Sequence, residues 1–507
     1  MNRSFVFCAL LSCLLCVSAG ADTARGIVFK DINGNGARDP GEKGLADVAV
    51  SNGRVVVRTD SKGRWQLPCD DDDILFAIKP TGWMTPLSPD NLPRFYYVHR
   101  PAGAPPTDVP GVAPTGPLPE SIDFPLQKCK EPREFKVLLF GDTQINDKTE
   151  LNYLGRDVVA ELIGADAAFG ISLGDNVGDS PELQESVAGI VGRIGIPWYN
   201  TIGNHDSTPG TRDDTASDDI FERVYGPPTY AFEHGGVSFI VLDSILIKEE
   251  GYDGGFREDQ LAFVKNYLAG VPRNQLVVMT MHIPFRGKSA QPMFELLAGR
   301  PHTFSVAAHT HEMFHVFFDK DRGWRGPNPH HQFVNGTVCG SWWCGLRDET
   351  GIPHSTMNDG APNGYAIATF DRNSYSVEYK VPRRPADYQM NIYIPDEVPV
   401  AETEKTEVLV NVFAGSEKSK VEMRVDRADW VNLEQTRTID PFCLRMHQDN
   451  QFNDKEALGY KFDKPSETSH MWKGTLPRMY AGTHVIEVRT KDMFGHTYSA
   501  NKILRVL

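Results

Sequence analysis

The sequence predicts a multi-domain protein, with a central α/β domain flanked by an N-terminal and a C-terminal β-sandwich domain. At 507 residues the chain is long enough for about three domains. Apolar strands alternate with helical stretches over residues 134–382, whereas short strands separated by turn residues precede and follow them. A Pro/Gly/Ala-rich tract at 101–119 approaches the first change of pattern. We therefore predict domains at 22–127, 128–382 and 383–507.

Residues 1–21 have the composition of a secretory signal peptide. Arg3 provides the positive start, residues 5–17 the apolar core, and residues 19–21 the small-residue cleavage site. A membrane anchor is the first alternative, although the apolar run is short for a span. A lipoprotein anchored at Cys13 is the second, and it would leave a very short leader. We predict a periplasmic or secreted protein with no transmembrane segment after leader removal.

The net charge of −15 argues against a nucleic acid polymer as partner. A phosphate substrate would therefore need local positive charge, such as bound metal. Three of the eight cysteines lie in the leader. Among the other five, Cys339–Cys344 and Cys69–Cys129 are the pairs we consider for an oxidising compartment, with one cysteine left over.

The first mature segment contains strands at 26–30, 48–51, 54–59, 65–67 and 74–78 by its pattern. Oxygen-bearing side chains at 31–42 occupy positions 1, 3, 5, 9 and 12 of a twelve-residue loop with Gly at position 6, as in calcium loops. These residues are Asp31, Asn33, Asn35, Asp39 and Glu42. The segment resembles the B-type sandwich modules of bacterial surface adhesins, which the turn and aromatic strand at 59–65 also match. The prediction is a structural calcium site, and the alternative is a polar loop without an ion.

In the central domain the pattern predicts strands at 135–140, 167–173, 197–201, 238–243, 276–281 and 303–307, with helices at 150–163, 181–194, 258–268 and 291–297. Polar residues follow the carboxyl ends of these strands, where open α/β sheets place their sites. The groups are Asp142-Thr143-Gln144, Gly174-Asp175-Asn176-Val177-Gly178-Asp179, Gly203-Asn204-His205-Asp206, His282 and His309-Thr310-His311. Any one group is weak evidence, but five in this order are difficult to produce as independent turns.

This set of motifs resembles the calcineurin-like metallophosphoesterase family over about residues 136–379, and in particular an exported subgroup with extra N- and C-terminal β domains. The resemblance implies a two-sheet α/β/β/α sandwich and two divalent metal ions. It places Asp142, Gln144, Asp175 and His311 on one ion, and Asp175, Asn204, His282 and His309 on the other. It makes His205 the imidazole near the phosphate, with Asp206 as its orienting partner.

One position departs from the family pattern, which usually has histidine where this chain has Gln144. An amide oxygen is a poorer ligand than imidazole for a borderline metal, so the expectation among Mn, Fe, Zn and Mg shifts away from zinc. Two such ions can bridge a water and generate the hydroxide that attacks phosphorus. The implied reaction is hydrolysis of a phosphate mono- or diester of a small or surface-attached molecule, without a covalent enzyme intermediate.

The sequence gives only weak candidates for contacts with the substrate. Phe285 and Arg286 follow His282, and Trp342-Trp343 could stack on a sugar or a base, although paired aromatic residues more often cap a core. For the histidines outside the two-metal pattern we predict surface or core positions; they are His315, His330 and His331.

After residue 382, short strands are predicted at 406–414, 420–425, 484–490 and 503–506. Two functions follow. The first is an exported dinuclear phosphoesterase. The alternative is a calcium-stabilised surface or carbohydrate-binding protein whose phosphoesterase domain has decayed. The retention of Asp175, Asn204, His205, His282 and the His309/His311 pair favours the enzyme.

Overall fold

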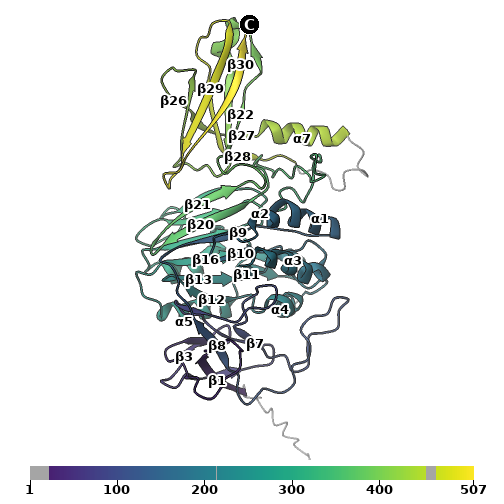
Figure 1. Ribbon diagram of the computed structural model, residues 1–507, viewed down its shortest axis with the longest axis vertical. Coiled ribbons are helices and arrows are strands. Elements are labelled where there is room, and N and C mark those ends of the chain that lie inside the picture. The colour runs from purple at the N-terminus through teal and green to yellow at the C-terminus, as the bar shows by residue number, and fades with distance from the viewer. Residues whose placement is uncertain (1–21, 213, 453–463) are drawn as a thin grey trace, which may run out of the picture.

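The computed structural model describes residues 22–212, 214–452 and 464–507, apart from the side chains of residues 215 and 450–452 (Figure 1). The predicted signal peptide lies outside the described residues. Along Figure 1 the chain runs from the N-terminal strands through the central sheets to the C-terminal strands.

The N-terminal region consists of two four-stranded sheets, ordered β4-β1-β8-β6 and β3-β2-β5-β7. One apolar cluster joins the two sheets, since Val28 and Leu126 come from the first and Val50 and Leu75 from the second. The strands are β1 (Asp22–Lys30), β2 (Ala49–Ser51), β3 (Val56–Arg58), β4 (Arg64–Cys69), β5 (Ile74–Ala77), β6 (Trp83–Met84), β7 (Tyr96–Val98) and β8 (Phe124–Lys128).

The central region contains a five-stranded sheet, β11-β10-β9-β20-β21, and a six-stranded sheet, β12-β13-β16-β17-β19-β18. The strands are β9 (Glu134–Phe140), β10 (Phe169–Leu173), β11 (Trp198–Thr201), β12 (Tyr230–His234), β13 (Val237–Leu242), β16 (Val277–Met281), β17 (Thr303–Ala307), β18 (Phe314–Phe318), β19 (His330–Val334), β20 (Tyr365–Asp371) and β21 (Ser374–Lys380). A separate hairpin pairs β14 (Ile245–Ile247) with β15 (Tyr252–Gly254).

The two central sheets pack face to face. Alternate residues of β9 point to opposite sides of its sheet. Val137 and Leu139 enter the core shared with the second sheet, whereas Leu138 and Phe140 pack beneath the first helices. Those helices are α1 (Lys148–Tyr153), η1 (Leu154–Val159), α2 (Ala160–Leu162), η2 (Pro181–Leu183), α3 (Gln184–Val191) and η3 (Gly192–Ile194). The remaining helices are η4 (Asn204–Asp206), η5 (Asp214–Ala216), α4 (Asp219–Tyr225), α5 (Glu258–Ala269), η6 (Gly287–Ala290) and α6 (Gln291–Leu297).

The helix predicted at 150–163 begins earlier and is not uniform. Asp147 caps it by accepting hydrogen bonds from the backbone N–H groups of Thr149 and Glu150. Its middle turn, η1, is π-helical. The predicted strands of this region all occur within a few residues of their expected bounds, which agrees with the apolar periodicity from which they were inferred.

The C-terminal region also contains two sheets, β22-β24-β28-β27 and β23-β30-β29-β25-β26, around a third apolar core. Its elements are β22 (Met390–Tyr393), β23 (Glu397–Val398), η7 (Val400–Lys405), β24 (Glu407–Val412), β25 (Lys420–Val425), β26 (Val431–Asn432), β27 (Glu434–Ile439), α7 (Pro441–Phe452), β28 (Glu467–Thr475), β29 (Gly482–Lys491) and β30 (Thr497–Val506). Figure 1 shows α7 projecting beside these sheets, on the side of α1.

Neither of the two candidate disulfides is formed, since Cys69, Cys129 and Cys339 are free thiols. Cys69 is buried in the N-terminal core, whereas the Cys129 sulfur lies 3.9 Å from a carboxylate oxygen of Glu131. Cys339 is buried in the central domain, and Cys344 packs instead in a small cluster with Cys443. Within the described ranges, no helix has the length and apolar character needed to cross a membrane.

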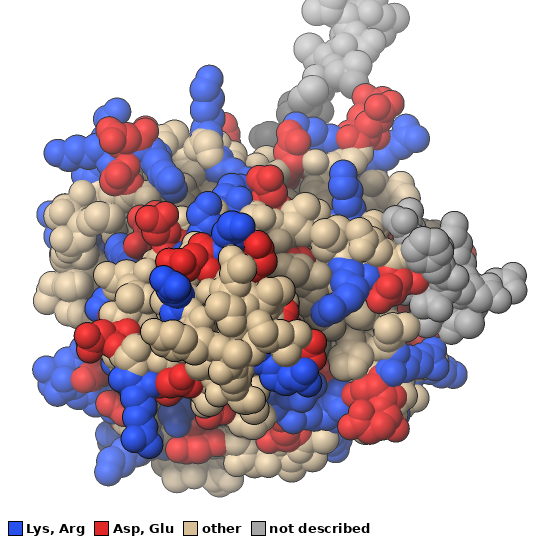
Figure 2. All heavy atoms as spheres, turned by 90° about the horizontal axis from the view of Figure 1, so that it is seen from above, with Lys and Arg blue, Asp and Glu red and all other residues tan. Residues whose placement is uncertain are grey.

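Seen from the C-terminal end, the surface carries acidic and basic side chains intermingled (Figure 2). This face therefore has no extended basic area of the kind that binds a polyanion.

Candidate metal centre

The predicted ligands lie in loops that follow β9, β10, β11, β16 and β17, and five of them have left-handed backbone conformations. The φ values are 33° at Asp142, 41° at Gln144, 50° at Asp175, 69° at His309 and 49° at His311. Non-glycine residues rarely adopt this region, and such strain concentrates at functional sites because the surrounding structure must hold it in place. Five strained residues in one place indicate that the loops are built to position side chains.

The turn after β11 lies directly against the turn after β10. A Cβ atom on Gly203 would lie 2.1 Å from the backbone nitrogen of Asp175, so only glycine allows this approach. The backbone N–H of His205 then donates to Asp175 Oδ1 at 2.9 Å. This contact brings Asn204 and His205 to the carboxylate that follows the neighbouring strand.

Asp175, His282 and His309 form a compact group, with one ligand atom of each lying within 4.8 Å of the others. Nε2 of His282 lies 3.1 Å from Asp175 Oδ2, 3.1 Å from Asn204 Oδ1 and 3.1 Å from His309 Nδ1. Nδ1 of His282 lies 2.9 Å from the carbonyl oxygen of Leu173, which fixes that nitrogen as the hydrogen-bond donor. Lone pairs of four side chains therefore converge on one point.

A divalent cation fits this group. One ring nitrogen cannot serve three acceptor atoms with a single proton, whereas a cation accepts donation from nitrogen and oxygen ligands together. Without metal, burial opposes charge on His282, but the charge of Asp175 raises its pKa to about 9. The pKa of His309 falls to about 3 through burial and the neighbouring His282. A neutral His309 can donate its lone pair to a metal.

A second set of candidate ligands adjoins the first. Asp142 is fully buried, and its Oδ1 atom has no hydrogen-bond partner among the described residues. Its Oδ2 accepts a hydrogen bond from the backbone N–H of His309. His311 directs Nδ1 to the carbonyl oxygen of Gly340 at 2.7 Å and Nε2 towards Asp142 Oδ1 at 3.7 Å. The unpaired buried oxygen beside a free ring nitrogen is what a second cation would satisfy.

Gln144 lies beside Asp175, but its amide presents the nitrogen and not the oxygen to the candidate site. Nε2 donates to Asp175 Oδ2 at 3.0 Å, and Oε1 faces the sulfur of Cys339 at 3.8 Å. Coordination through the oxygen would require rotation of the amide, so the ligand role of Gln144 stays a prediction.

The predicted pairing of Asp206 with His205 is wrong. Nδ1 of His205 lies 2.9 Å from Asp179 Oδ1 instead. The carboxylate of Asp206 is fully buried and accepts hydrogen bonds from the backbone N–H groups of Gly203, Asn176 and Val177. Burial, together with the charge of Asp175, raises the pKa of Asp206 to about 7. Asp206 therefore holds the two turns together and does not touch the imidazole.

Of the four predicted substrate residues, Trp342 lies against the site. Its ring stacks on His311 with centroids 5.0 Å apart and meets the edge of His205 at 5.3 Å. Arg286 is exposed, and its charge acts on His309. Both side chains can face a ligand.

The other two substrate predictions are wrong, because these side chains are core residues. Trp343 is 4% exposed and donates its indole N–H to the carbonyl oxygen of Thr143 at 2.9 Å. Phe285 is also 4% exposed and packs on Phe256 and Phe294.

The sequence contained no indication of Tyr252, and it placed Asp179 in the polar group after β10 without a role. Tyr252 is 41% exposed on the β14–β15 hairpin, with its ring 6.1 Å from that of His309. A hairpin far from the motifs in sequence gave no signal for it. Asp179 is the last residue of the polar group that begins at Gly174, but that position did not indicate its contact with His205.

His315, His330 and His331 lie away from the ligands, as predicted. His330 is fully buried between Thr303 Oγ1 and Ser305 Oγ, each 2.8 Å from a ring nitrogen, and burial lowers its pKa to about 3. It is a core residue.

In the predicted calcium loop, the carboxylates that would bind calcium accept hydrogen bonds from other groups of the same loop. Asp31 accepts from the backbone N–H groups of Gly34 and Gly36, and Glu42 accepts from those of Ile32 and Asp39. The amides of Asn33 and Asn35 both donate to Asp39 Oδ2. The loop is closed by these bonds, and calcium binding stays a prediction.

Two family models match the chain. Residues 32–107 match the N terminal of calcineurin-like phosphoesterase, and residues 332–498 match the C terminal of calcineurin-like phosphoesterase. A purple acid phosphatase from yellow lupin (Lupinus luteus) seeds aligns over 67% of this chain and 69% of its own, with 10% identity and a TM-score of 0.36. A hypothetical protein from Thermus thermophilus aligns over 49% of this chain and all of its own, with 16% identity and a TM-score of 0.28. The chain matches no curated protein.

Proposed function

The chain belongs to the calcineurin-like phosphoesterase family, and from this premise we propose that it is an exported hydrolase of small phosphate esters that uses two divalent metal ions. The observation that carries the proposal is the convergence of Asp175, Asn204 and His309 on one nitrogen of His282, next to the unpaired buried oxygen of Asp142.

Asp175 would serve both ions, because its carboxylate contacts Gln144 of one candidate set and His282 of the other. Asp142 and His311 would complete one set, with Gln144 if its amide turns. Asn204, His282 and His309 would complete the other. The ions, when bound, supply Lewis-acid activation of the phosphate ester and of the attacking water. Mn, Fe, Zn and Mg all suit nitrogen and oxygen ligands of this kind.

His205 is the residue that we assign to proton transfer. Its side chain is 22% exposed, so it reaches both the ligand cluster and the solvent side. Because Nδ1 is engaged with Asp179, Nε2 is the nitrogen left to donate a proton to the leaving oxygen. The carboxylate of Asp179 fixes the orientation of the ring.

The ring of Trp342 covers one side of the candidate site, next to His311 and His205. Its ring contacts both His311 and His205, so it keeps water from one side of the reacting group and restrains the two imidazoles. Tyr252 and Arg286 lie near His309 and offer an aromatic and a cationic contact to the alcohol portion of an ester.

Export is proposed from the leader sequence at residues 1–21. In a periplasmic or extracellular setting the substrate would be a small or surface-attached phosphate ester.

The test is metal analysis and hydrolysis on the same purified mature protein, with a mono-aryl and a bis-aryl phosphate as substrates. We expect two equivalents of transition metal or magnesium and turnover of one ester. Asn204→Ala should remove the turnover, whereas Asn274→Ala, at an exposed asparagine beyond α5, should retain it. Calcium alone, with equal background rates in all three proteins, would overturn the proposal and favour a binding protein with a decayed catalytic domain.

A further inference from the structure

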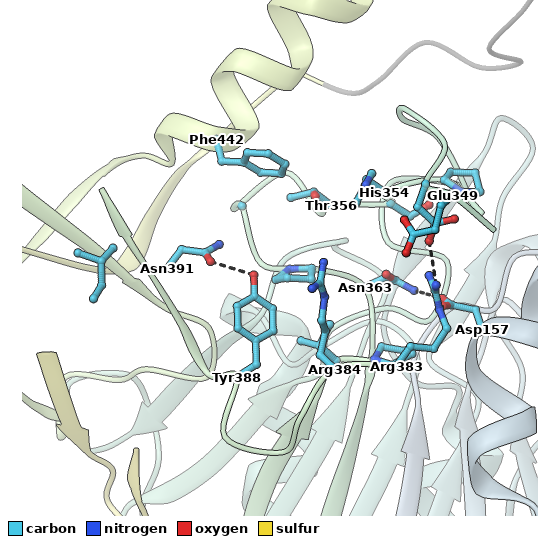
Figure 3. Close-up of a pocket in the computed structure, with 18 of the residues that line it drawn as sticks. Asp157, Glu349, His354, Thr356, Asn363, Arg383, Arg384, Tyr388, Asn391 and Phe442 are labelled. Atoms are coloured by element: carbon cyan, nitrogen blue, oxygen red, sulfur yellow. Dashed lines mark hydrogen bonds and ion pairs between the residues drawn. The ribbon is translucent and has the colours of Figure 1, made fainter. Parts of the chain in front are cut away.

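A cavity of about 480 Å³ lies between the central and C-terminal regions, outside the metal centre. This volume is within the roughly 300–1,000 Å³ range of small-molecule sites. Its floor comes from the segment after β21, one wall from the 348–363 loop, and the opposite wall from β22 and α7. Figure 3 shows Phe442, Thr356 and Glu349 above the opening, and Tyr388 and Arg384 below it.

Three charged side chains on the wall of the cavity already pair with one another. Arg383 donates to Asp157 Oδ1 at 2.6 Å and lies 2.8 Å from Asp348 Oδ2. The pKa of Asp348 is low because hydrogen bonds from Thr350 and Arg383 outweigh burial. Arg383 and these two carboxylates therefore form a fixed rim of the cavity, held by their own ion pairs.

Two further charges of opposite sign remain without a partner. Arg384 has no carboxylate partner within the described ranges; its guanidinium lies 5.7 Å from the ring centre of Tyr388 and points into the opening in Figure 3. Glu349 is exposed and also lacks an ion-pair partner there. Because a free cation and a free carboxylate face the same space, neither an anion nor a cation is favoured as ligand.

The uncharged groups offer both halves of a hydrogen bond. Tyr388 donates to Asn391 Oδ1, which leaves the Asn391 amide nitrogen as a donor. The Asn363 amide nitrogen donates to Asp157, which leaves its oxygen as an acceptor. Thr356 adds a buried hydroxyl that can do either. Two aromatic faces, Tyr388 and Phe442, border the same opening.

We propose that this cavity binds a neutral carbohydrate unit. Each sugar hydroxyl can both donate and accept a hydrogen bond. The several hydroxyls of one sugar can therefore pair with the donors (the Asn391 nitrogen and Arg384) and with the acceptors (the Asn363 oxygen and Glu349). The apolar C–H face of a pyranose packs against an aromatic ring. Because the walls of the cavity come from the central and the C-terminal regions, a bound sugar would connect these two regions. This site does not depend on the proposed catalytic activity.

The test is saturation-transfer NMR followed by calorimetry on the mature protein treated with a chelator, so that catalytic metals cannot hold the sugar. The probes are glucose, galactose, mannose and N-acetylglucosamine, with glucuronate and inorganic phosphate as charged comparisons. We expect at least one neutral sugar to bind, and Arg384→Ala to weaken it at least tenfold. Arg427→Ala, at an exposed arginine of the C-terminal region, should bind as the parent does.

The variant Asn391→Asp gives a second measurement at unchanged size, since it replaces the free donor by an acceptor. We expect it to weaken the same sugar. Equal thermal unfolding of the three variants and the parent would show that the fold is kept. Absence of binding by every neutral sugar, tighter binding of glucuronate or phosphate, or equal loss in Arg384→Ala and Arg427→Ala would each overturn the proposal.

Discussion

Nδ1 of His205 lies 2.9 Å from Asp179 Oδ1, so the imidazole nearest the metal ligands is oriented by a carboxylate on a different loop. Asp206, its neighbour in sequence, is buried and engaged with backbone N–H groups. The side chain of Asp179 is 89% exposed. Solvent therefore screens the pair, and its value lies more in orienting the ring than in electrostatic stabilisation.

We expect Asp179→Asn to lower kcat about tenfold and His205→Ala to lower it about a hundredfold. The double variant should be no slower than His205→Ala, because both changes affect the same proton transfer. Metal content should not change. Asp166→Asn, at an exposed aspartate without a contact to the site, is the matched control. A double variant far slower than either single variant would contradict the pairing.

His282→Ala should remove metal from the candidate site that His282 forms with Asp175, Asn204 and His309, since His282 Nε2 lies 3.1 Å from an atom of each. We expect at least a tenfold weaker affinity at this site and loss of hydrolysis. Elemental analysis after dialysis against a fixed free-metal concentration measures the loss. His302→Ala, at a partly exposed histidine bonded to Asn274, should keep the full metal content. Equal metal in both variants would exclude His282 as a ligand.

Apolar periodicity was enough to locate β9, β10, β11, β13, β16 and β17 of the eleven strands in the central sheets. The order of polar groups after these strands was enough to place Asp175, Asn204, His282 and His309 together. These features depend on local sequence and on the direction of parallel strands. The partner of His205 could not be predicted this way, since Asp179 reaches it across two loops. Likewise, the sequence could not tell which of two adjacent tryptophans faces the core, because strained φ values of 56° and 52° at Trp342 and Trp343 set their directions.

The two adjacent tryptophans should therefore respond differently to truncation. Trp342→Ala should lower activity with little change in stability, because its half-buried ring contacts His311 and His205. Trp343→Ala should destabilise the protein by about 3–5 kcal/mol, because it empties a buried site and leaves the Thr143 carbonyl oxygen unpaired. Denaturant unfolding and kcat/KM, measured on both variants, test this. Similar losses of stability in the two would contradict the assignment.

The stability of the folded protein should depend on pH through two buried carboxyl groups of the central region, Asp218 and Glu222. Burial raises the pKa of Asp218 to about 8, with Asp243 adding to the shift. Burial also raises the pKa of Glu222 to about 8, with Asp218 adding to it. Because both values lie above those of the unfolded chain, the folded state holds protons that the unfolded state releases. Their stabilising contribution is complete below about pH 4 and is lost as the pH rises through 8.

We therefore expect Asp218→Asn to flatten the fall in unfolding free energy between pH 5 and pH 8 by about 1 kcal/mol per pH unit. Denaturant titrations at four pH values measure the slope. Asp166→Asn provides the control. An unchanged slope in Asp218→Asn would show that this carboxyl is already ionised in the folded protein at pH 5.

Calcium should stabilise the N-terminal region if the loop at 31–42 exchanges its internal hydrogen bonds for an ion. The Asp31 carboxylate is 2% exposed and accepts two backbone hydrogen bonds, so the loop is preorganised. At a hundredfold excess over Kd, calcium would add about 2.7 kcal/mol to the unfolding free energy. Asp39→Ala should abolish that gain, since it removes the oxygen that holds Asn33 and Asn35, whereas Asp108→Ala, at an exposed aspartate of the same region, should keep it. Calorimetric unfolding with calcium or with chelator measures both. The same unfolding curve in either condition would establish a polar loop that needs no ion.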